Sequence, residues 1–160
     1  MEPAWYAIID CAQDPRLVDL VRACAVKLCL FKGEDLDPDL LSVAPWLVRI
    51  DPAEALLPTW QQHGHAASWG LMLLSSQRIE DLQRHYRRFL QTKLPDGTIA
   101  LFRFYDPRVF NTYIRAARPE ERAGWFGPVL QYSVESEGGT AMHHYRLLEG
   151  GLYDGDDRIG

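Results

Sequence analysis

The chain has 160 residues, of which 47% are hydrophobic, 24% charged and 11% aromatic, and its formal net charge is −5. This length suits one domain with a substantial core, and the composition is typical of a soluble globular protein. The acidic balance argues against a general nucleic-acid binder or a protein of anionic membrane surfaces. No apolar run approaches the ~20 residues that span a bilayer. Three cysteines without a CxxC pattern, and an N-terminus unlike a signal peptide, predict a protein of the reducing cytoplasm.

Apolar runs alternate with helical patterns through most of the chain. Strands are expected at residues 5–10, 27–31, 46–51, 68–74 and 98–106. Helices are expected at residues 15–25, 38–44, 53–63 and 78–91, and after Asp106 with apolar positions over 109–117. The alternation predicts an α/β fold with a mixed, largely parallel sheet flanked by helices.

The character of the sequence changes after residue 126. Two strands, over 129–135 and 141–148, are joined by the turn sequence SEGG and are predicted to form a β-hairpin. Residues 151–160 are polar and rich in glycine, which predicts a flexible tail. The expected organisation is an α/β domain over 1–130, a hairpin extension of the same domain over 131–150, and that tail.

The dipeptide Asp-Pro occurs four times, at Asp14, Asp37, Asp51 and Asp106, whereas chance predicts roughly one for this composition. Each copy precedes a helical pattern. Aspartate is a favoured N-cap because its carboxylate accepts a hydrogen bond from the first turn, and proline suits the first helical position. Asp106 is therefore interpreted as a helix cap, with a catalytic acid as the alternative.

Three arginines lie close to these dipeptides. Arg16 and Arg108 each follow an Asp-Pro, and a positive charge in a first helical turn opposes the helix dipole unless an acid is near. Each arginine either pairs with a nearby acid or points at a partner from the loop edge. Arg103 lies between two phenylalanines, and a buried guanidinium needs an acceptor. We expect a structural buried pair of Arg103 with Asp10 or Asp51.

Motifs for nucleotide binding, serine hydrolysis and zinc proteolysis are absent from the sequence. The histidines at 63, 65, 143 and 144 lack a further ligand at a useful spacing, so neither a metal nor a cofactor is predicted. The basic run over 84–88, together with Lys93, is interpreted as a solvated helix face. A docking surface for an acidic partner is the alternative for this run.

A second alternative concerns catalysis. Asp10, Asp51 and Asp106 each end a predicted strand, and the carboxyl edge of an open α/β sheet is where ligands bind. If the three carboxylates converged there, the protein could be a hydrolase or a metal-dependent enzyme. No nucleophile–base pair in the sequence supports that function.

Five segments together resemble the domain of unknown function 4123 family. They are WYAIIDCAQDPRL, APWLVRIDP, SWGLMLLSS, LQRHYRRFLQTKLPDGTIALFRFYDPRVF and FGPV. The resemblance covers about residues 5–130. Positions of the chain that match recurrent family positions are Asp14, Pro15, Arg16, Pro45, Asp51, Trp69, Gly70, Arg88, Arg103, Tyr105, Asp106, Pro107, Arg108 and Pro128.

The resemblance implies a non-enzymatic role. Family members act as adaptor chaperones in the cytoplasm of the producing bacterium, where they bind a toxic type VI secretion effector and help load it onto the spike-tip (VgrG-type) protein. The implied partners are therefore that effector and that spike protein, without nucleic acid, membrane, metal or cofactor. Matching positions chosen as candidate contacts are Arg16, Asp51, Trp69, Arg88, Arg103, Tyr105, Asp106 and Arg108.

Two surfaces are expected to carry these contacts. The first is a loop edge bearing Arg16, Asp51 and Arg108. The second is an aromatic edge around Trp46, Trp60 and Trp69, since tryptophan is common at interface hot spots.

Overall fold

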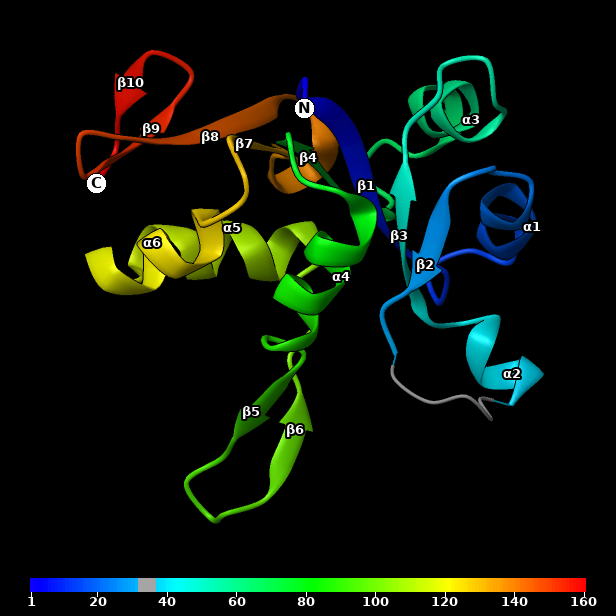
Figure 1. The fold of residues 1–160 in the computed structure, drawn as a ribbon, viewed down its shortest axis with the longest axis horizontal. Helices are drawn as coiled ribbons and strands as arrows, with labels where there is room; N and C mark the ends of the chain where they lie inside the picture. The colour runs from blue at the N-terminus through cyan, green and yellow to red at the C-terminus, as the bar shows by residue number, and fades with distance from the viewer. Residues whose placement is uncertain (32–36) are drawn as a thin grey trace.

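The computed structural model describes residues 1–31 and 37–160. Its main sheet has the strand order β10-β9-β8-β7-β4-β1-β3-β2 (Figure 1). These strands are β1 (Ala4–Asp10), β2 (Lys27–Cys29), β3 (Pro45–Arg49), β4 (Gly70–Ser75), β7 (Gln131–Glu135), β8 (Met142–Leu148), β9 (Gly151–Asp154) and β10 (Asp157–Arg158). The helices are α1 (Arg16–Arg22), α2 (Pro38–Leu41), α3 (Leu56–His63), α4 (Ile79–Arg87), α5 (Pro107–Ala116) and α6 (Pro119–Phe126).

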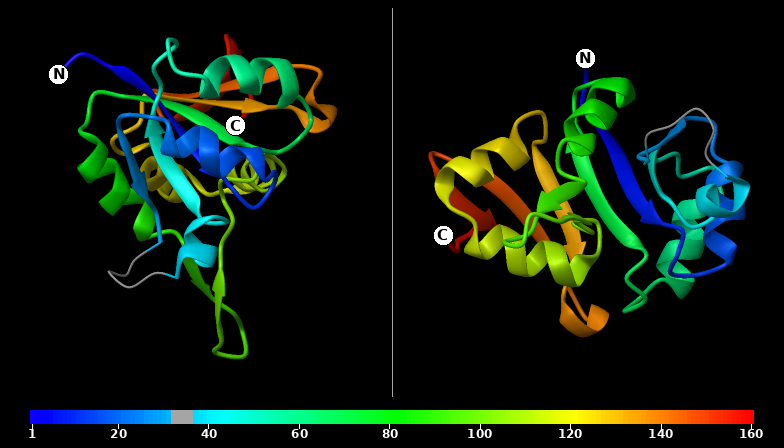
Figure 2. Two further views of the ribbon diagram at one scale, coloured as in Figure 1. Left: turned by 90° about the vertical axis from the view of Figure 1, so that its right-hand side faces the viewer. Right: turned by 90° about the horizontal axis from the view of Figure 1, so that it is seen from below.

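Every neighbouring pair of strands in the main sheet is antiparallel, so the predicted, largely parallel sheet is wrong. Two of the helical connections do join strands of the same direction, but each of them spans an intervening strand. Helix α3 connects β3 to β4 with β1 between them, and α1 connects β1 to β2 with β3 between them (Figure 2). Strand–helix alternation in a sequence does not reveal which strand lies between the two that a helix joins.

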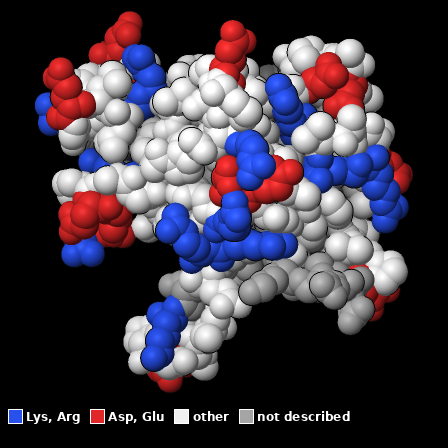
Figure 3. Space-filling model, in the orientation of Figure 1, with Lys and Arg blue, Asp and Glu red and all other residues white. Residues whose placement is uncertain are grey.

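A second, two-stranded sheet projects from the body of the molecule (Figure 1). It consists of β5 (Gln91–Lys93) and β6 (Ile99–Leu101), joined by the predicted turn at Pro95-Asp96-Gly97. The Asp96 carboxylate accepts a 2.9 Å hydrogen bond from the Thr98 amide. The expected helix over 78–91 therefore ends at Arg87, and the expected strand over 98–106 is reduced to β6. Lys and Arg side chains gather where this hairpin joins the body (Figure 3).

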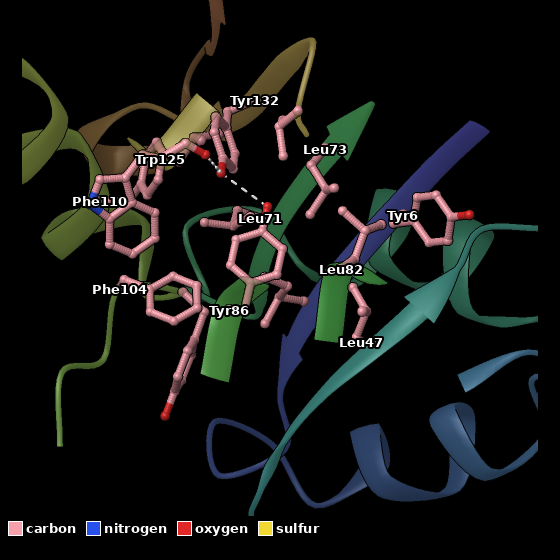
Figure 4. Packing of buried hydrophobic residues seen from close by; sticks show 14 of the residues in the cluster. Tyr6, Leu47, Leu71, Leu73, Leu82, Tyr86, Phe104, Phe110, Trp125 and Tyr132 are labelled. Carbon is pink, nitrogen blue, oxygen red and sulfur yellow. Dashed lines mark hydrogen bonds between the residues drawn. The ribbon is translucent and has the colours of Figure 1, made fainter. Parts of the chain in front are cut away.

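Two apolar layers lie on opposite faces of the main sheet. Tyr6 and Ile8 of β1 face the larger layer with α4, α5 and α6, whereas Ala7 and Ile9 face α1 and α3. The larger layer is rich in aromatic rings (Figure 4). Within it, the Trp125 ring stacks on Phe89 with a 4.0 Å centroid separation. Aromatic pairs of this kind contribute about 0.5–1.5 kcal/mol each beyond area burial, so they add to the stability of this layer.

Two buried tyrosine hydroxyl groups form a hydrogen bond with each other inside the aromatic layer. Tyr132 donates its hydroxyl proton to the Trp125 carbonyl at 2.7 Å. Its oxygen lies 2.9 Å from the Tyr86 hydroxyl, which is therefore the donor in that second bond (Figure 4). Burial raises the pKa of both phenols, so both stay neutral. A buried hydroxyl without a partner would be destabilising, and this relay leaves neither one unpaired.

The C-terminal region combines confirmed and unexpected elements. The β7–β8 hairpin is confirmed, with Tyr132 opposite Tyr145. Residues 151–160, expected as a flexible tail, instead contain β9 and β10, and Leu152 of β9 is fully buried. A single buried leucine in a glycine-rich polar stretch gives little periodic signal, which explains the difference. No helix within the described residues is long and apolar enough to cross a membrane.

Candidate partner-binding site

The sequences Asp14-Pro15-Arg16 and Asp106-Pro107-Arg108 fold into the same turn. In the first, Asp14 accepts hydrogen bonds from the Arg16 amide at 2.9 Å, Nε at 3.1 Å and Nη2 at 2.8 Å. In the second, the matching distances from Arg108 to Asp106 are 2.9, 3.0 and 2.7 Å. Each aspartate thus accepts a hydrogen bond from the backbone amide two residues later and holds one side of the guanidinium of the same residue. Each arginine is held in one geometry while its side chain remains more than half exposed.

The neighbouring arginines stabilise the ionised form of both aspartates. The hydrogen bond with the Arg16 side chain lowers the pKa of Asp14 to about 2. Burial alone would raise the pKa of Asp106, but the Arg108 side chain and amide, with the charges of Arg108 and Arg103, lower it below its ordinary value. Both carboxylates are therefore ionised near neutral pH, and neither is placed as a proton donor.

The cap predicted for each Asp-Pro is confirmed in part. Asp37 and Asp106 are the N-caps of α2 and α5. Asp14 lies one residue before the N-cap of α1 and bonds to the first helical amide. Asp51 bonds to the Ala53 amide at 2.9 Å, but α3 begins only at Leu56. The same local bond therefore forms at all four sites, and at Asp51 it closes a turn instead of a helix.

Arg103 pairs with Asp10, one of its two expected partners. Arg103 Nη2 lies 2.5 Å from Asp10 Oδ2, and Asp10 also accepts bonds from the Ala12 amide and from Gln13 Nε2. Only Asp10 is buried: its side chain is 2% exposed, against 45% for Arg103. The expectation of a buried arginine in a strand is wrong, since β6 ends at Leu101. The pair instead joins the end of β1 to the loop before α5.

A strained turn lies between the two Asp-Pro-Arg turns. Ala66 and Ser68 have φ values of 58° and 56°, which are unusual for residues other than glycine. Glu135, at the end of β7, accepts hydrogen bonds from both of their amides at 3.0 Å. Backbone in this region costs about 1–3 kcal/mol per residue and persists where its surroundings enforce it. The sequence gives no sign of this role of Glu135, because nothing local links it to a turn more than sixty residues away.

Both clamped arginines flank this turn. The Arg16 guanidinium lies 5.5 Å from the ring centroid of Trp69, the residue that follows the turn. Arg108 shares a shallow hollow of about 110 Å³ with Ala66 and Ser68. We call the surface formed by Arg16, Arg103 and Arg108 around residues 66–69 the arginine edge. Guanidinium groups with one side clamped leave their remaining N–H groups for another acceptor, such as a partner carboxylate or carbonyl.

The other candidate contacts fall in different places. Trp69, Tyr105 and Asp106 are buried, so they pack beneath the arginine edge instead of contacting a partner directly. Burial raises the pKa of Tyr105 to about 12. Asp51 is exposed but follows Ile50, whose amide bonds to Trp5 at the opposite end of β1 from Asp10. The expected loop edge with Asp51 in it is therefore wrong. Arg88 lies apart, at the end of α4.

Neither the acidic trio nor the aromatic edge is assembled. Asp10 and Asp51 lie at opposite ends of β1, because β3 is antiparallel to β1. The described residues contain no group of three or more His, Cys, Asp or Glu that could hold a metal ion. Trp69 is buried in the α1–α3 layer, and Trp46 and Trp60 pack against the same layer. The three tryptophans therefore build the core of that face more than they present a surface.

Comparison with protein-family models matches residues 5–124 to a domain of unknown function (DUF4123). The chain belongs to the DUF4123 family. Neither the curated proteins nor the solved structures contain a match to the chain. The matched span includes all three arginines of the arginine edge and ends inside α6, so β7 to β10 lie beyond it.

Proposed function

We propose that this DUF4123 protein is an adaptor chaperone that binds a type VI secretion effector and helps load it onto the spike-tip protein. The proposal starts from the family resemblance in the sequence. It gains support from a surface suited to gripping another protein: clamped arginines at the arginine edge. An enzymatic role has no comparable support, because the carboxylates that would serve it do not meet.

The observation that carries the proposal is the pair of identical Asp-Pro-Arg clamps. A free arginine loses up to ~2 kcal/mol of side-chain entropy when a partner immobilises it. Arg16 and Arg108 are already fixed by Asp14 and Asp106, so less of that entropy remains to be lost on binding. Two such residues on either side of one rigid turn form a preorganised surface for carboxylates and main-chain carbonyls of a partner.

The proposal predicts physical retention of two partners. The tagged protein, co-expressed with the candidate effector and spike protein encoded beside its gene, should co-purify with both. The control is the same pair of proteins without the adaptor, in which the effector should not associate with the spike. Failure to retain either partner, with the adaptor folded as judged by its melting curve, would contradict the adaptor role.

A further inference from the structure

A groove lies where the β5–β6 hairpin joins the body. It measures about 660 Å³ and is lined by Leu30, Phe31, Leu40, Arg84, Arg87, Arg88, Leu90, Gln91 and Leu101. Its apolar residues come from the end of β2, from α2 and from the hairpin, and its arginines come from the last turn of α4. We call it the hairpin groove. It shares no lining residue with the arginine edge.

Two of the groove arginines have neutral partners among the described residues. Arg87 donates to the backbone carbonyls of Leu30 and Phe31 at 3.2 and 3.1 Å, which fixes its position without cancelling its charge. Arg88 Nη2 lies 3.0 Å from His85 Nδ1. Burial lowers the pKa of His85 to about 4, so this histidine is neutral near pH 7. Arg84 is different, because it forms an ion pair with Asp81.

The hairpin extends the groove as an apolar surface. Gln91 pairs with Leu101 and Lys93 with Ile99. Because alternate residues of a strand share a face, Ile99 and Lys93 lie on the same face as Leu101, which lines the groove. Ile99 is 68% exposed and Leu101 47% exposed, which are high values for such residues. The surface therefore pairs exposed apolar side chains with several cations in a protein whose net charge is −5.

We propose that the hairpin groove binds an acidic segment of a protein partner that also carries apolar side chains. Its carboxylates pair with Arg84, Arg87 and Arg88, and its apolar residues pack on Leu40, Leu101 and Ile99. Charge complementarity favours such a segment, and Figure 3 shows the basic side chains concentrated at this place. A nucleic acid fits less well, since the acidic protein repels an extended phosphate backbone and five of the nine groove-lining residues are apolar.

This inference deepens the proposed function and rests on it for the identity of the partner. An adaptor that joins an effector to a spike protein needs two surfaces, and the hairpin groove and the arginine edge are built from different residues. Binding at the groove can nevertheless be measured without either natural partner.

The probe is a fluorescein-labelled synthetic peptide of alternating Glu and Leu, titrated by fluorescence anisotropy. Matched peptides carry Gln in place of Glu, or Ser in place of Leu. Arg84→Gln/Arg88→Gln removes charge from the groove and leaves Arg87 to hold its backbone carbonyls. Its control, Arg22→Gln/Arg146→Gln, removes the same charge elsewhere. Leu101→Ser is compared with Leu130→Ser, since both leucines are about half exposed.

The expected result is that the Glu–Leu peptide binds and both substituted peptides bind at least about fivefold more weakly. The groove double variant should weaken binding about tenfold and Leu101→Ser severalfold, with both controls unchanged. Equal binding to the groove variant and its control would overturn the inference. So would tighter binding of a single-stranded DNA oligonucleotide that competes with the peptide.

Two measurements keep this test separate from the adaptor test. Melting curves identify any variant that fails to fold, and Leu101→Ala then replaces Leu101→Ser. Arg16→Ala/Arg108→Ala reports whether the peptide binds at the arginine edge instead of the groove, and a loss as large as that of the groove double variant would overturn the inference. If the peptide fails to bind while effector and spike still co-purify with the parent, the groove inference fails and the adaptor proposal stands.

Discussion

The two Asp-Pro-Arg turns share the three hydrogen bonds from arginine to the aspartate carboxylate but differ in where they lie. The Asp14 side chain is 19% exposed and lies just before α1, a helix of seven residues over the smaller layer. The Asp106 side chain is 7% exposed and begins a ten-residue helix that packs into the aromatic layer. A local motif fixes its own geometry, whereas the stability it contributes depends on what surrounds it. The Asp-Pro-Arg sequence therefore stabilises the fold mainly at Asp106, whereas at both positions its arginine remains available to bind a partner.

The largest difference is expected between the two aspartates. Asp106→Ala removes a helix cap at a buried position and should lower the free energy of unfolding by about 2 kcal/mol, the upper end for caps. Asp14→Ala should cost clearly less, because water can replace the lost bonds more readily at its more exposed site. Urea unfolding of both variants measures the difference. Equal losses would show that burial does not separate the two turns.

The Arg103–Asp10 pair is expected to have the next largest effect. Arg103→Ala leaves the buried Asp10 carboxylate without its cation, which costs about 1–3 kcal/mol. The half-exposed arginine site admits water, so we expect the lower part of that range. Arg103→Ala/Asp10→Asn should recover part of the loss, because the stranded charge is then absent. A melting temperature of Arg103→Ala equal to that of the parent would refute the structural role of the pair.

A smaller, pH-dependent effect follows from the lowered pKa of Asp106. Its pKa is lower in the folded chain than in the unfolded chain, so ionised Asp106 stabilises the fold above its ordinary pKa near 3.8. That stability is lost as the pH falls through the lowered folded value. The stability gap between the parent and Asp106→Asn should therefore be full at pH 7 and narrow in acid. A gap that stays constant from pH 7 down to acid unfolding would contradict the charge pairing.

The smallest effect on stability is expected for the clamped arginines themselves. Arg16→Ala removes an ion pair at a partly exposed site, and such pairs contribute little to stability. Arg108→Ala should cost slightly more, because Asp106 is only 7% exposed, but the carboxylate keeps its bond to the backbone amide of residue 108 and the nearby charge of Arg103. The melting temperature of Arg16→Ala should lie close to that of the parent, and that of Arg108→Ala only a little lower. A large loss for either would indicate that its guanidinium holds the fold together, in conflict with a role in binding.

The sequence predicted local features well. Most strands and helices, the turn at Pro95-Asp96-Gly97 and the β7–β8 hairpin depend on neighbouring residues, and the structure contains them. The partner of Arg103 could be narrowed to two aspartates because few acids end apolar strands. The Asp-Pro repeats likewise predicted the bond that each aspartate forms.

Non-local features escaped prediction. Strand β1 is antiparallel to β3 and β4, because the helical connections span an intervening strand. Asp51, which follows β3, therefore lies at the opposite end of β1 from Asp10. Glu135 holds the turn at Ala66 and Ser68 across a long stretch of chain. Helix α6 and strand β9 have weak periodicity and form through packing of Trp125 and Leu152. In each case tertiary contacts decided what local pattern left undetermined.

The most direct test of the account is partner retention by the Arg16→Ala/Arg108→Ala double variant. Arg22→Ala/Arg115→Ala, which removes two other helix-surface arginines, is the control. Retention of effector and spike should be compared by pull-down from equal amounts of folded protein. The account predicts a melting temperature near that of the parent and at least about a tenfold loss of one partner, with the control unchanged. Full retention of both partners by the double variant would contradict it.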